Sequence, residues 1–344
     1  MIARSRQPRL ALRRAGWLAF ASLLEGTACG ERYDPLSDEQ IQKAISTQSA
    51  LDVAELHDLV GQIYEARLSD PEKDTSRSEH CGGGGDCVYS RVATADLIRN
   101  YWSSIELAGA EPHEHVVDAD AFTTHNLFLD IPGRTHPDEW VLATAHYDAW
   151  FGGANDNATG VAVVLAATRA LLAAALDRSV RLILFDGEEL GMVGAGRYVS
   201  DYGTDGVVLA LNADSVAFVG ATGSFLTRQP SDIEYIVQAN EPSAELAYQL
   251  TDLARRLPRP LAMRPLVFPG DGVSLAGVVI GYDRSDHAQF WLDGARALFP
   301  FPAGDKPDWY HTAGDTPEQV DADRLERFGR LWVAALAAFA SVRP

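Results

Sequence analysis

An apolar run near the middle of the chain ends abruptly in acidic residues. Leu182–Phe185 is entirely aliphatic or aromatic, and Asp186-Gly187-Glu188-Glu189 follows it directly. A short apolar run bounded by glycine is typical of a strand that is buried on both faces. Gly160–Leu176 is Ala-rich and almost wholly apolar, which predicts a buried helix. A strand at Trp140–Ala145, this helix and a strand at Val180–Phe185 predict a parallel pair with a right-handed crossover.

The rest of the chain alternates between helical and strand-like patterns. Because no internal repeat interrupts this alternation, we expect a three-layer α/β/α sandwich on a mixed, mostly parallel central sheet. His115–Val117, Asn126–Ile131, Val207–Leu211 and Ala297–Phe301 predict further strands, and Phe218–Glu241 predicts an irregular insertion. The other predicted helices are Leu51–Leu68, Ser90–Gly109, Gly194–Tyr202, Ser243–Leu257, Asp286–Leu292 and Gln319–Val342.

The N-terminus predicts an exported protein. Several arginines precede Ala15–Leu24, an apolar stretch too short to cross a bilayer, and Gly26-Thr27-Ala28 offers small residues for cleavage. Cleavage there would expose Cys29, which resembles a bacterial lipoprotein signal whose cysteine is lipidated and tethers the protein to a membrane. We therefore expect a periplasmic, outer-membrane or extracellular protein. The predicted organisation is a signal peptide over 1–28, a helical extension with a Gly-rich loop over 29–89, and the α/β domain over 90–344.

The net charge and the cysteines limit which binding partners and which cellular compartment we expect. The formal net charge is −19 at pH 7, so the chain has no basic surplus with which to bind nucleic acid. Cys81 and Cys87 bracket the flexible run Gly82–Asp86, which favours a disulfide in an oxidising compartment. A small metal site with His80 is the alternative for this pair. The oligomeric state is not predicted.

Acidic residues and histidines follow several of the predicted strands. In an open α/β sheet, ligands bind in the crevice at the carboxyl ends of the strands. Two imidazoles and three carboxylates there suit Zn²⁺, and one bridging carboxylate lets five residues hold two ions. Each residue alone is also compatible with a solvated turn or a helix cap. The five candidate ligands are His146, Asp156, Glu189, Asp214 and His311.

Six short segments in this order resemble the co-catalytic di-zinc aminopeptidases, a family that also includes glutaminyl cyclases and some carboxypeptidases. The resemblance covers roughly Phe122 to the C-terminus. The segments are His146-Tyr147-Asp148, Gly153–Gly160, Glu188–Gly191, Asn212-Ala213-Asp214, Arg284–His287 and Tyr310-His311-Thr312.

The resemblance implies a metal centre with two Zn²⁺ ions. Asp156 resembles the carboxylate that bridges both ions. His146 and Asp214 resemble the remaining ligands of one ion, and Glu189 and His311 resemble those of the other. By the same resemblance, residues 90–344 form a di-zinc peptidase domain.

The resemblance also implies the residues that carry the chemistry. Glu188 resembles the general base that takes a proton from a zinc-activated water and delivers it to the leaving amine. Tyr310 resembles the phenol that stabilises the oxyanion. Asp148 would hydrogen-bond His146 and fix its tautomer. Asp286 and His287 resemble residues that lie behind the ligands or line the pocket.

The function that this resemblance implies is hydrolysis of the N-terminal residue from peptides with a free N-terminus. A glutaminyl cyclase is the first alternative, although those enzymes typically carry Trp directly before the final histidine, where this chain has Tyr310. A catalytically inactive binding domain is the second alternative, and the presence of all five ligand positions and Glu188 argues against it.

Overall fold

The computed structural model describes residues 33–76, 81, 87–118, 122–220, 232–273 and 284–342. The chain from Pro35 onward forms one compact unit. The predicted signal peptide at 1–28, Cys29 and the run Gly82–Asp86 lie outside the described residues. No helix among the described residues combines the length and the apolar character needed to cross a bilayer.

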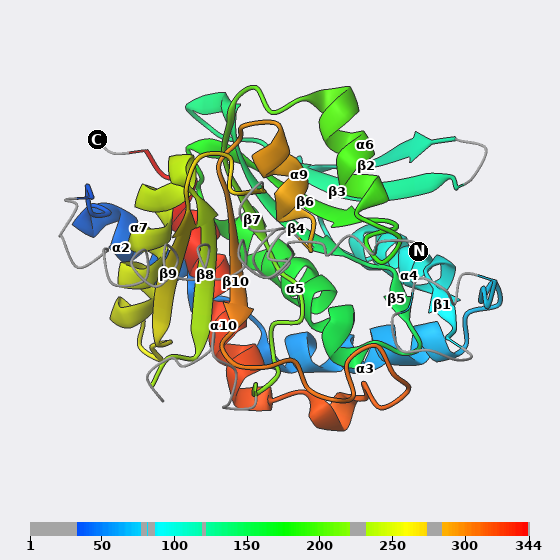
Figure 1. The fold of residues 1–344 in the computed structure, drawn as a ribbon. Helices are drawn as coiled ribbons and strands as arrows, with labels where there is room; N and C mark the ends of the chain where they lie inside the picture. The colour runs from blue at the N-terminus through cyan, green and yellow to red at the C-terminus, as the bar shows by residue number, and fades with distance from the viewer. Residues whose placement is uncertain are drawn as a thin grey trace, which may run out of the picture. The chain divides into compact units, whose positions relative to one another are not determined.

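A mixed sheet forms the centre of this unit (Figure 1). The middle strands β6, β4, β7 and β10 are parallel neighbours, whereas β2, β3 and β8 introduce antiparallel pairings. The predicted α/β fold is therefore confirmed. Among the described residues the strand order is β2 (Glu111–Val117), β3 (Thr124–Ile131), β6 (Arg178–Phe185), β4 (His136–His146), β7 (Val207–Asn212), β10 (Ala297–Pro302), β8 (Tyr235–Asn240) and β9 (Met263–Phe268).

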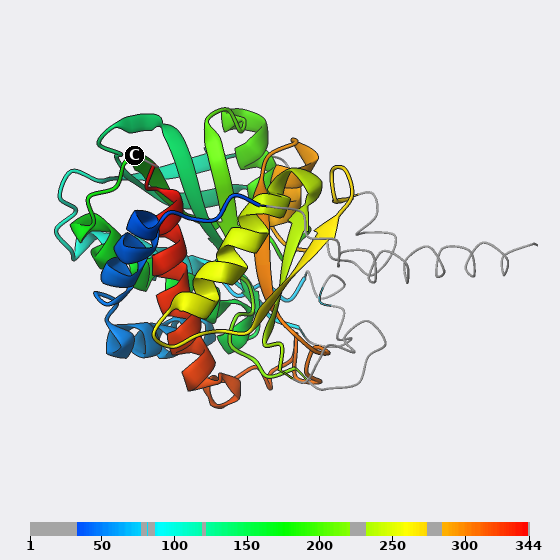
Figure 2. The ribbon, with the colours of Figure 1, turned by 90° about the vertical axis from the view of Figure 1, so that its left-hand side faces the viewer.

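Helices cover both faces of the sheet because β6 is apolar on both. Leu182 and Leu184 join one hydrophobic cluster, and Ile183 and Phe185 join the other. Figure 2 shows α2, α7 and α10 on the face toward the viewer. The first cluster packs α2 (Asp38–Gln48), α3 (Val53–Leu68), α4 (Val92–Ser103), α5 (Thr159–Ala173), α7 (Ala244–Arg256) and α10 (Ala322–Phe339), and the second packs α6 (Val193–Tyr202) and α9 (His287–Leu292).

The predicted strand–helix–strand unit at the centre of the chain is present as β4, α5 and β6. The parallel register pairs Ala145 with Leu184 and His146 with Phe185. The two strands therefore end side by side, and the polar residues that follow each of them emerge at the same edge of the sheet.

Two local predictions were wrong, and one strand was not predicted. β8 occupies the end of the segment expected to be irregular, because Gln238 and Asn240 interrupt its apolar pattern although both are buried. β9 was missed because it contains Pro265, which is tolerated at this edge of the sheet. The helix predicted to begin at Ser90 begins at Val92 instead, and Ser90 does not cap it. Ser90 lies in strand β1 (Tyr89–Ser90), and its hydroxyl donates to Asp70 at 2.8 Å.

The described residues between Pro35 and Ser90 pack against the α/β body. α2 contacts α10, and α3 contacts α5. β1 pairs with β5 (Ala149–Trp150), which lies just after β4. The predicted disulfide between Cys81 and Cys87 is confirmed.

Candidate metal centre

The five predicted ligands lie together at the carboxyl edge of the central strands. His146 is the last residue of β4, Glu189 follows β6, and Asp214 follows β7. These three strands are parallel neighbours, so their ends share one edge. Asp156 lies in the turn η3 (Ala154–Ala158) that leads into α5. His311 comes from the loop between β10 and α10.

Asp156 lies between the two histidines. Its Oδ1 is 3.3 Å from His146 Nε2, and its Oδ2 is 3.2 Å from His311 Nε2. Asp214 Oδ1 is 3.6 Å from His146 Nε2, whereas Glu189 Oε2 is 3.0 Å from His311 Nε2. The shortest distances thus form two sets of three residues that share Asp156, which is the arrangement that a bridging carboxylate between two ions requires.

The two sets are not separate clusters. Potential ligand atoms of His146, Asp156 and Glu189 lie within 4.8 Å of one another, and so do those of His146, Glu188 and Asp214. If two ions bind, the shortest nitrogen–oxygen distances would place His146 and Asp214 on one ion and Glu189 and His311 on the other.

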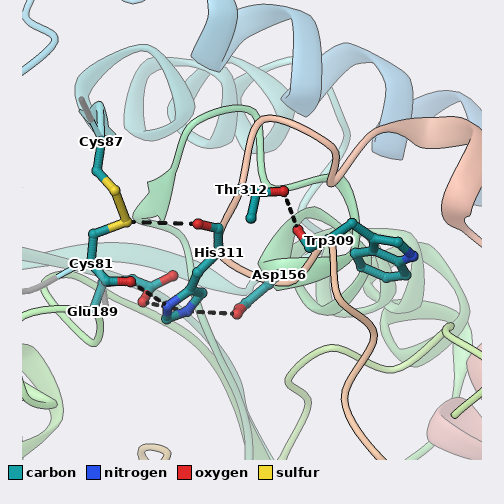
Figure 3. Close-up of a disulfide and its surroundings, with 7 residues drawn as sticks. All are labelled: Cys81, Cys87, Asp156, Glu189, Trp309, His311 and Thr312. Atoms are coloured by element: carbon teal, nitrogen blue, oxygen red, sulfur yellow. Dashed lines mark hydrogen bonds and ion pairs between the residues drawn. A yellow bond between two sulfur atoms is a disulfide. The ribbon is translucent and has the colours of Figure 1, made fainter. Parts of the chain in front are cut away.

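Both imidazoles present Nε2 to this cluster while a main-chain carbonyl holds Nδ1. His146 Nδ1 is 3.1 Å from the carbonyl oxygen of Asp148, and His311 Nδ1 is 3.2 Å from that of Cys81 (Figure 3). Because a carbonyl only accepts, the proton of each neutral ring lies on Nδ1 and the lone pair lies on Nε2. Neither Nε2 has a hydrogen-bond partner among the described residues.

Negative charge dominates the cluster. Burial raises the pKa of Glu188 well above its usual value, and repulsion from Glu189 and Asp214 adds to the effect of burial while His146 opposes it. Burial lowers the pKa of His311, but the nearby negative charges of Glu189 and Asp156 outweigh it and raise that pKa to about 11. Buried carboxylates in this number call for cations, and the nitrogen and oxygen donors present fit Zn²⁺.

The contact between Asp148 and His146 differs from the predicted one. Its Oδ1 is 3.6 Å from His146 Nδ1, too far for a hydrogen bond, so the main-chain carbonyl of Asp148 fixes this imidazole instead. The carboxylate accepts the amides of Glu188 and Glu189, each at 3.1 Å, and the hydroxyl of Tyr89 at 2.9 Å. Asp148 therefore holds the imidazole with its backbone and both glutamates with its side chain.

Two buried charged residues that the sequence did not single out hold the Asp156 turn. Asp315 accepts the amides of Asn155 at 2.8 Å and Asp156 at 2.9 Å. Arg67, in α3, donates to three main-chain carbonyls between β4 and η3. A lone charged residue is usually exposed, so the sequence did not mark Arg67 as part of the site. The only indication for Asp315 was its closeness to His311 in the sequence.

The remaining predicted residues lie close to the cluster. Tyr310 stacks on His311 with ring centroids 3.9 Å apart. Asp286 is fully buried, and neither carboxylate oxygen has a hydrogen-bond partner among the described residues. Burial raises the pKa of Asp286 to about 8, with Asp148 and Asp214 adding to it and His146 opposing it. His287 packs edge-on against Trp291.

Known proteins resemble this chain in sequence and in fold. The aminopeptidase YwaD of Bacillus subtilis is 28% identical over 212 residues, which cover 58% of this chain and 41% of that protein. The Legionella pneumophila LapA aminopeptidase superposes with a TM-score of 0.66 at 16% identity, covering 91% of this chain and 78% of that one. The Bacteroides thetaiotaomicron glutaminyl cyclase superposes with a TM-score of 0.57 at 14% identity, covering 83% and 98%.

These comparisons differ in what they establish. At such low identity, the two structural likenesses show the fold alone. The chain spans less than half the length of the first curated relatives it matches. The model of peptidase family M28 matches residues 126–336, which is more than half of the chain and includes every predicted metal ligand. This chain belongs to peptidase family M28.

Proposed function

We propose that this protein is an aminopeptidase that uses two Zn²⁺ ions to remove the N-terminal residue of peptides. The observation that carries the proposal is the pair of buried Nε2 atoms, of His146 and His311, on either side of Asp156 without hydrogen-bond partners among the described residues. Membership of family M28 and the sequence likeness to an aminopeptidase support peptides as the substrate class.

The bound ions would supply Lewis acidity, which polarises the scissile carbonyl and lowers the pKa of the attacking water. Glu188 Oε2 lies 3.9 Å from His146 Nε2, farther than the carboxylates assigned to the ions, so this side chain is left to carry a proton. We assign Glu188 to take the proton from water and deliver it to the leaving amine. Its position is fixed by the Asp148 carboxylate, which accepts its main-chain amide.

Tyr310 is the proposed donor to the oxyanion. Burial raises the pKa of its phenol well above the usual value, and the neighbouring Asp156 and Glu189 raise it further. The phenol therefore stays protonated at neutral pH, which is the state that can donate a hydrogen bond to a developing negative charge.

The test is a Glu188→Gln variant. We expect kcat on aminoacyl chromogenic substrates to fall by roughly 10²–10⁴-fold, the usual contribution of a general base. Zinc content should stay at two ions per chain, because the assigned ligands are untouched. Glu111→Gln is the matched control, since the Glu111 side chain is 79% exposed. Near-normal turnover of Glu188→Gln would refute the assigned role.

A glutaminyl cyclase is the second candidate, because one such enzyme shares the fold. A peptide with N-terminal Gln separates the two functions. Release of free amino acid identifies a peptidase, whereas ammonia release with ring closure and no loss of a residue identifies a cyclase.

We also propose that the protein is exported. The disulfide between Cys81 and Cys87 supports this, because such bonds persist mainly in oxidising compartments. Tethering through a lipidated Cys29 remains part of this proposal, and mass spectrometry of the mature N-terminus would test it.

A further inference from the structure

The Cys81–Cys87 disulfide lies against the candidate metal centre. Both cysteines are buried and belong to a small apolar cluster with Tyr89 and Trp150. Leu190, the residue directly after the assigned ligand Glu189, packs on the same cluster. Figure 3 shows the disulfide beside His311, Glu189 and Asp156. A bond between two residues of the N-terminal extension is thus built into the wall of the site.

Two contacts join Cys81 to His311, which lies 230 residues later in the chain. The Nδ1 atom of His311 donates to the carbonyl oxygen of Cys81 at 3.2 Å. In the opposite direction, Cys81 Sγ lies 3.7 Å from the carbonyl oxygen of His311. A disulfide sulfur has no hydrogen, so the second contact is packing rather than a hydrogen bond. Together they hold both the ring and the backbone of His311.

The backbone of His311 needs such support. Its φ is 55°, in the left-handed region that residues other than glycine seldom adopt. A residue persists in this conformation only where its surroundings hold it there. Because the direction of Nε2 depends on this backbone and on the Nδ1 hydrogen bond, a change at Cys81 would turn the ligand atom away from Asp156 and Glu189.

Cys87, at the other end of the disulfide, is held in place by its neighbours in the chain. Val88, next to Cys87, accepts the main-chain amide of Phe151 at 2.6 Å. Tyr89 pairs with Trp150 in the small sheet of β1 and β5. Cys87 is therefore anchored to the loop after β4, and the disulfide extends that anchorage to Cys81. The two cysteines have a sequence separation of only 6. A disulfide that closes so short a loop contributes least to the stability of the folded state.

We propose that the Cys81–Cys87 disulfide is a positioning device for His311: it holds the Cys81 carbonyl on Nδ1 and so directs Nε2 to the ion shared with Glu189. The inference rests on the proposed two-metal function. Its specific claim is that the disulfide acts on one of the two metal sites. The imidazole of His146 is held by a different main-chain carbonyl, that of Asp148.

The experiment measures the affinity of each variant for Zn²⁺ by competition with a chromophoric chelator. In Cys81→Ala/Cys87→Ala, we expect one of the two ions to bind about 10-fold more weakly, the smaller end of the effect of losing a partner behind a ligand. Alanine is used because free thiols would themselves bind zinc. Glu111→Gln is the matched control, since the Glu111 side chain is 79% exposed, and it should bind both ions with wild-type affinity.

A double-mutant cycle identifies the site. His311→Ala should bind a single ion, and removing both cysteines in that background should change its affinity by less than about twofold, as expected for uncoupled sites. Circular dichroism of the metal-free variants checks folding, and Cys81→Ser/Cys87→Ser replaces the alanine pair if that pair does not fold.

The outcomes separate the two proposals. If the wild-type protein does not bind two ions, the proposed function fails. If it does, but the cysteine variant binds both ions with wild-type affinity, the positioning role is wrong. The role is equally wrong if loss of the disulfide weakens the remaining ion in the His311→Ala background by the same factor as in the wild-type protein.

Discussion

The guanidinium of Arg67 supports the metal centre from inside the protein, and its removal should be costly. Arg67 is fully buried. It donates to the carbonyl oxygens of Tyr147 at 2.9 Å, Gly152 at 3.2 Å and Gly153 at 2.6 Å. Burial lowers its pKa to about 10, although Asp148 and other nearby carboxylates oppose that shift. It therefore remains charged at neutral pH.

The loss of stability in Arg67→Met depends on how many buried carbonyl oxygens lose their hydrogen-bond donor. Methionine retains an unbranched apolar stem, so lost hydrogen bonds matter more than an empty cavity. Gly153 keeps a second donor, the amide of Ala158 at 3.0 Å. The carbonyls of Tyr147 and Gly152 have no other donor among the described residues. At about 1–3 kcal/mol for each unsatisfied buried acceptor, the free energy of unfolding should fall by about 2–6 kcal/mol.

Thermal unfolding in the presence of a chelator would measure this loss without a contribution from bound metal. At roughly 2 °C per kcal/mol for a chain of this size, Tm should fall by about 4–12 °C. Arg169→Met is the control, because its side chain is 52% exposed and lies 3.4 Å from Glu55, a surface pair worth about 1 kcal/mol at most. Equal Tm values for the two variants would refute the reasoning.

Two further predictions concern the metal centre. Asp315→Asn should weaken Zn²⁺ binding about 10-fold, because an amide side chain cannot accept both main-chain N–H groups of the Asp156 turn. Competition with a chelator measures the affinity, and an unchanged value would contradict this prediction. Zinc binding at pH 7 should release protons, because His311 has a pKa of about 11 and is protonated before an ion binds, so affinity should rise with pH. Titration calorimetry in buffers with different ionisation heats measures that release, and a binding heat independent of the buffer would exclude it.

The central strands were predictable because they are buried on both faces. A segment of this kind is usually apolar at successive positions, as in the run Leu182–Phe185. Strands at the margin carry weaker patterns. β9 contains Pro265, and β8 buries Gln238 and Asn240. Asn240 donates to the carbonyl oxygen of Ala295, a partner that only the fold brings close.

The five candidate ligands were predictable as a set for a related reason. Metal ligands are side chains of a few types, and the carboxyl ends of parallel strands bring successive loops to one edge. His146, Glu189 and Asp214 each follow a strand that the sequence shows clearly. Their convergence with Asp156 and His311 was therefore expected from their order along the chain, and the structure contains it.

The groups behind the ligands could not be predicted in this way. His146 and His311 are fixed by main-chain carbonyls, which every residue possesses, so no residue type marks the positions that supply them. Arg67 resembles any polar residue of an amphipathic helix until α3 packs against the body. The sequence alone thus determined which side chains can bind metal and at which edge of the sheet they gather. Only the tertiary structure decided how each imidazole is oriented, because that depends on which main-chain carbonyl reaches Nδ1. For His146 it is the carbonyl of Asp148, and for His311 it is that of Cys81, from a distant part of the chain.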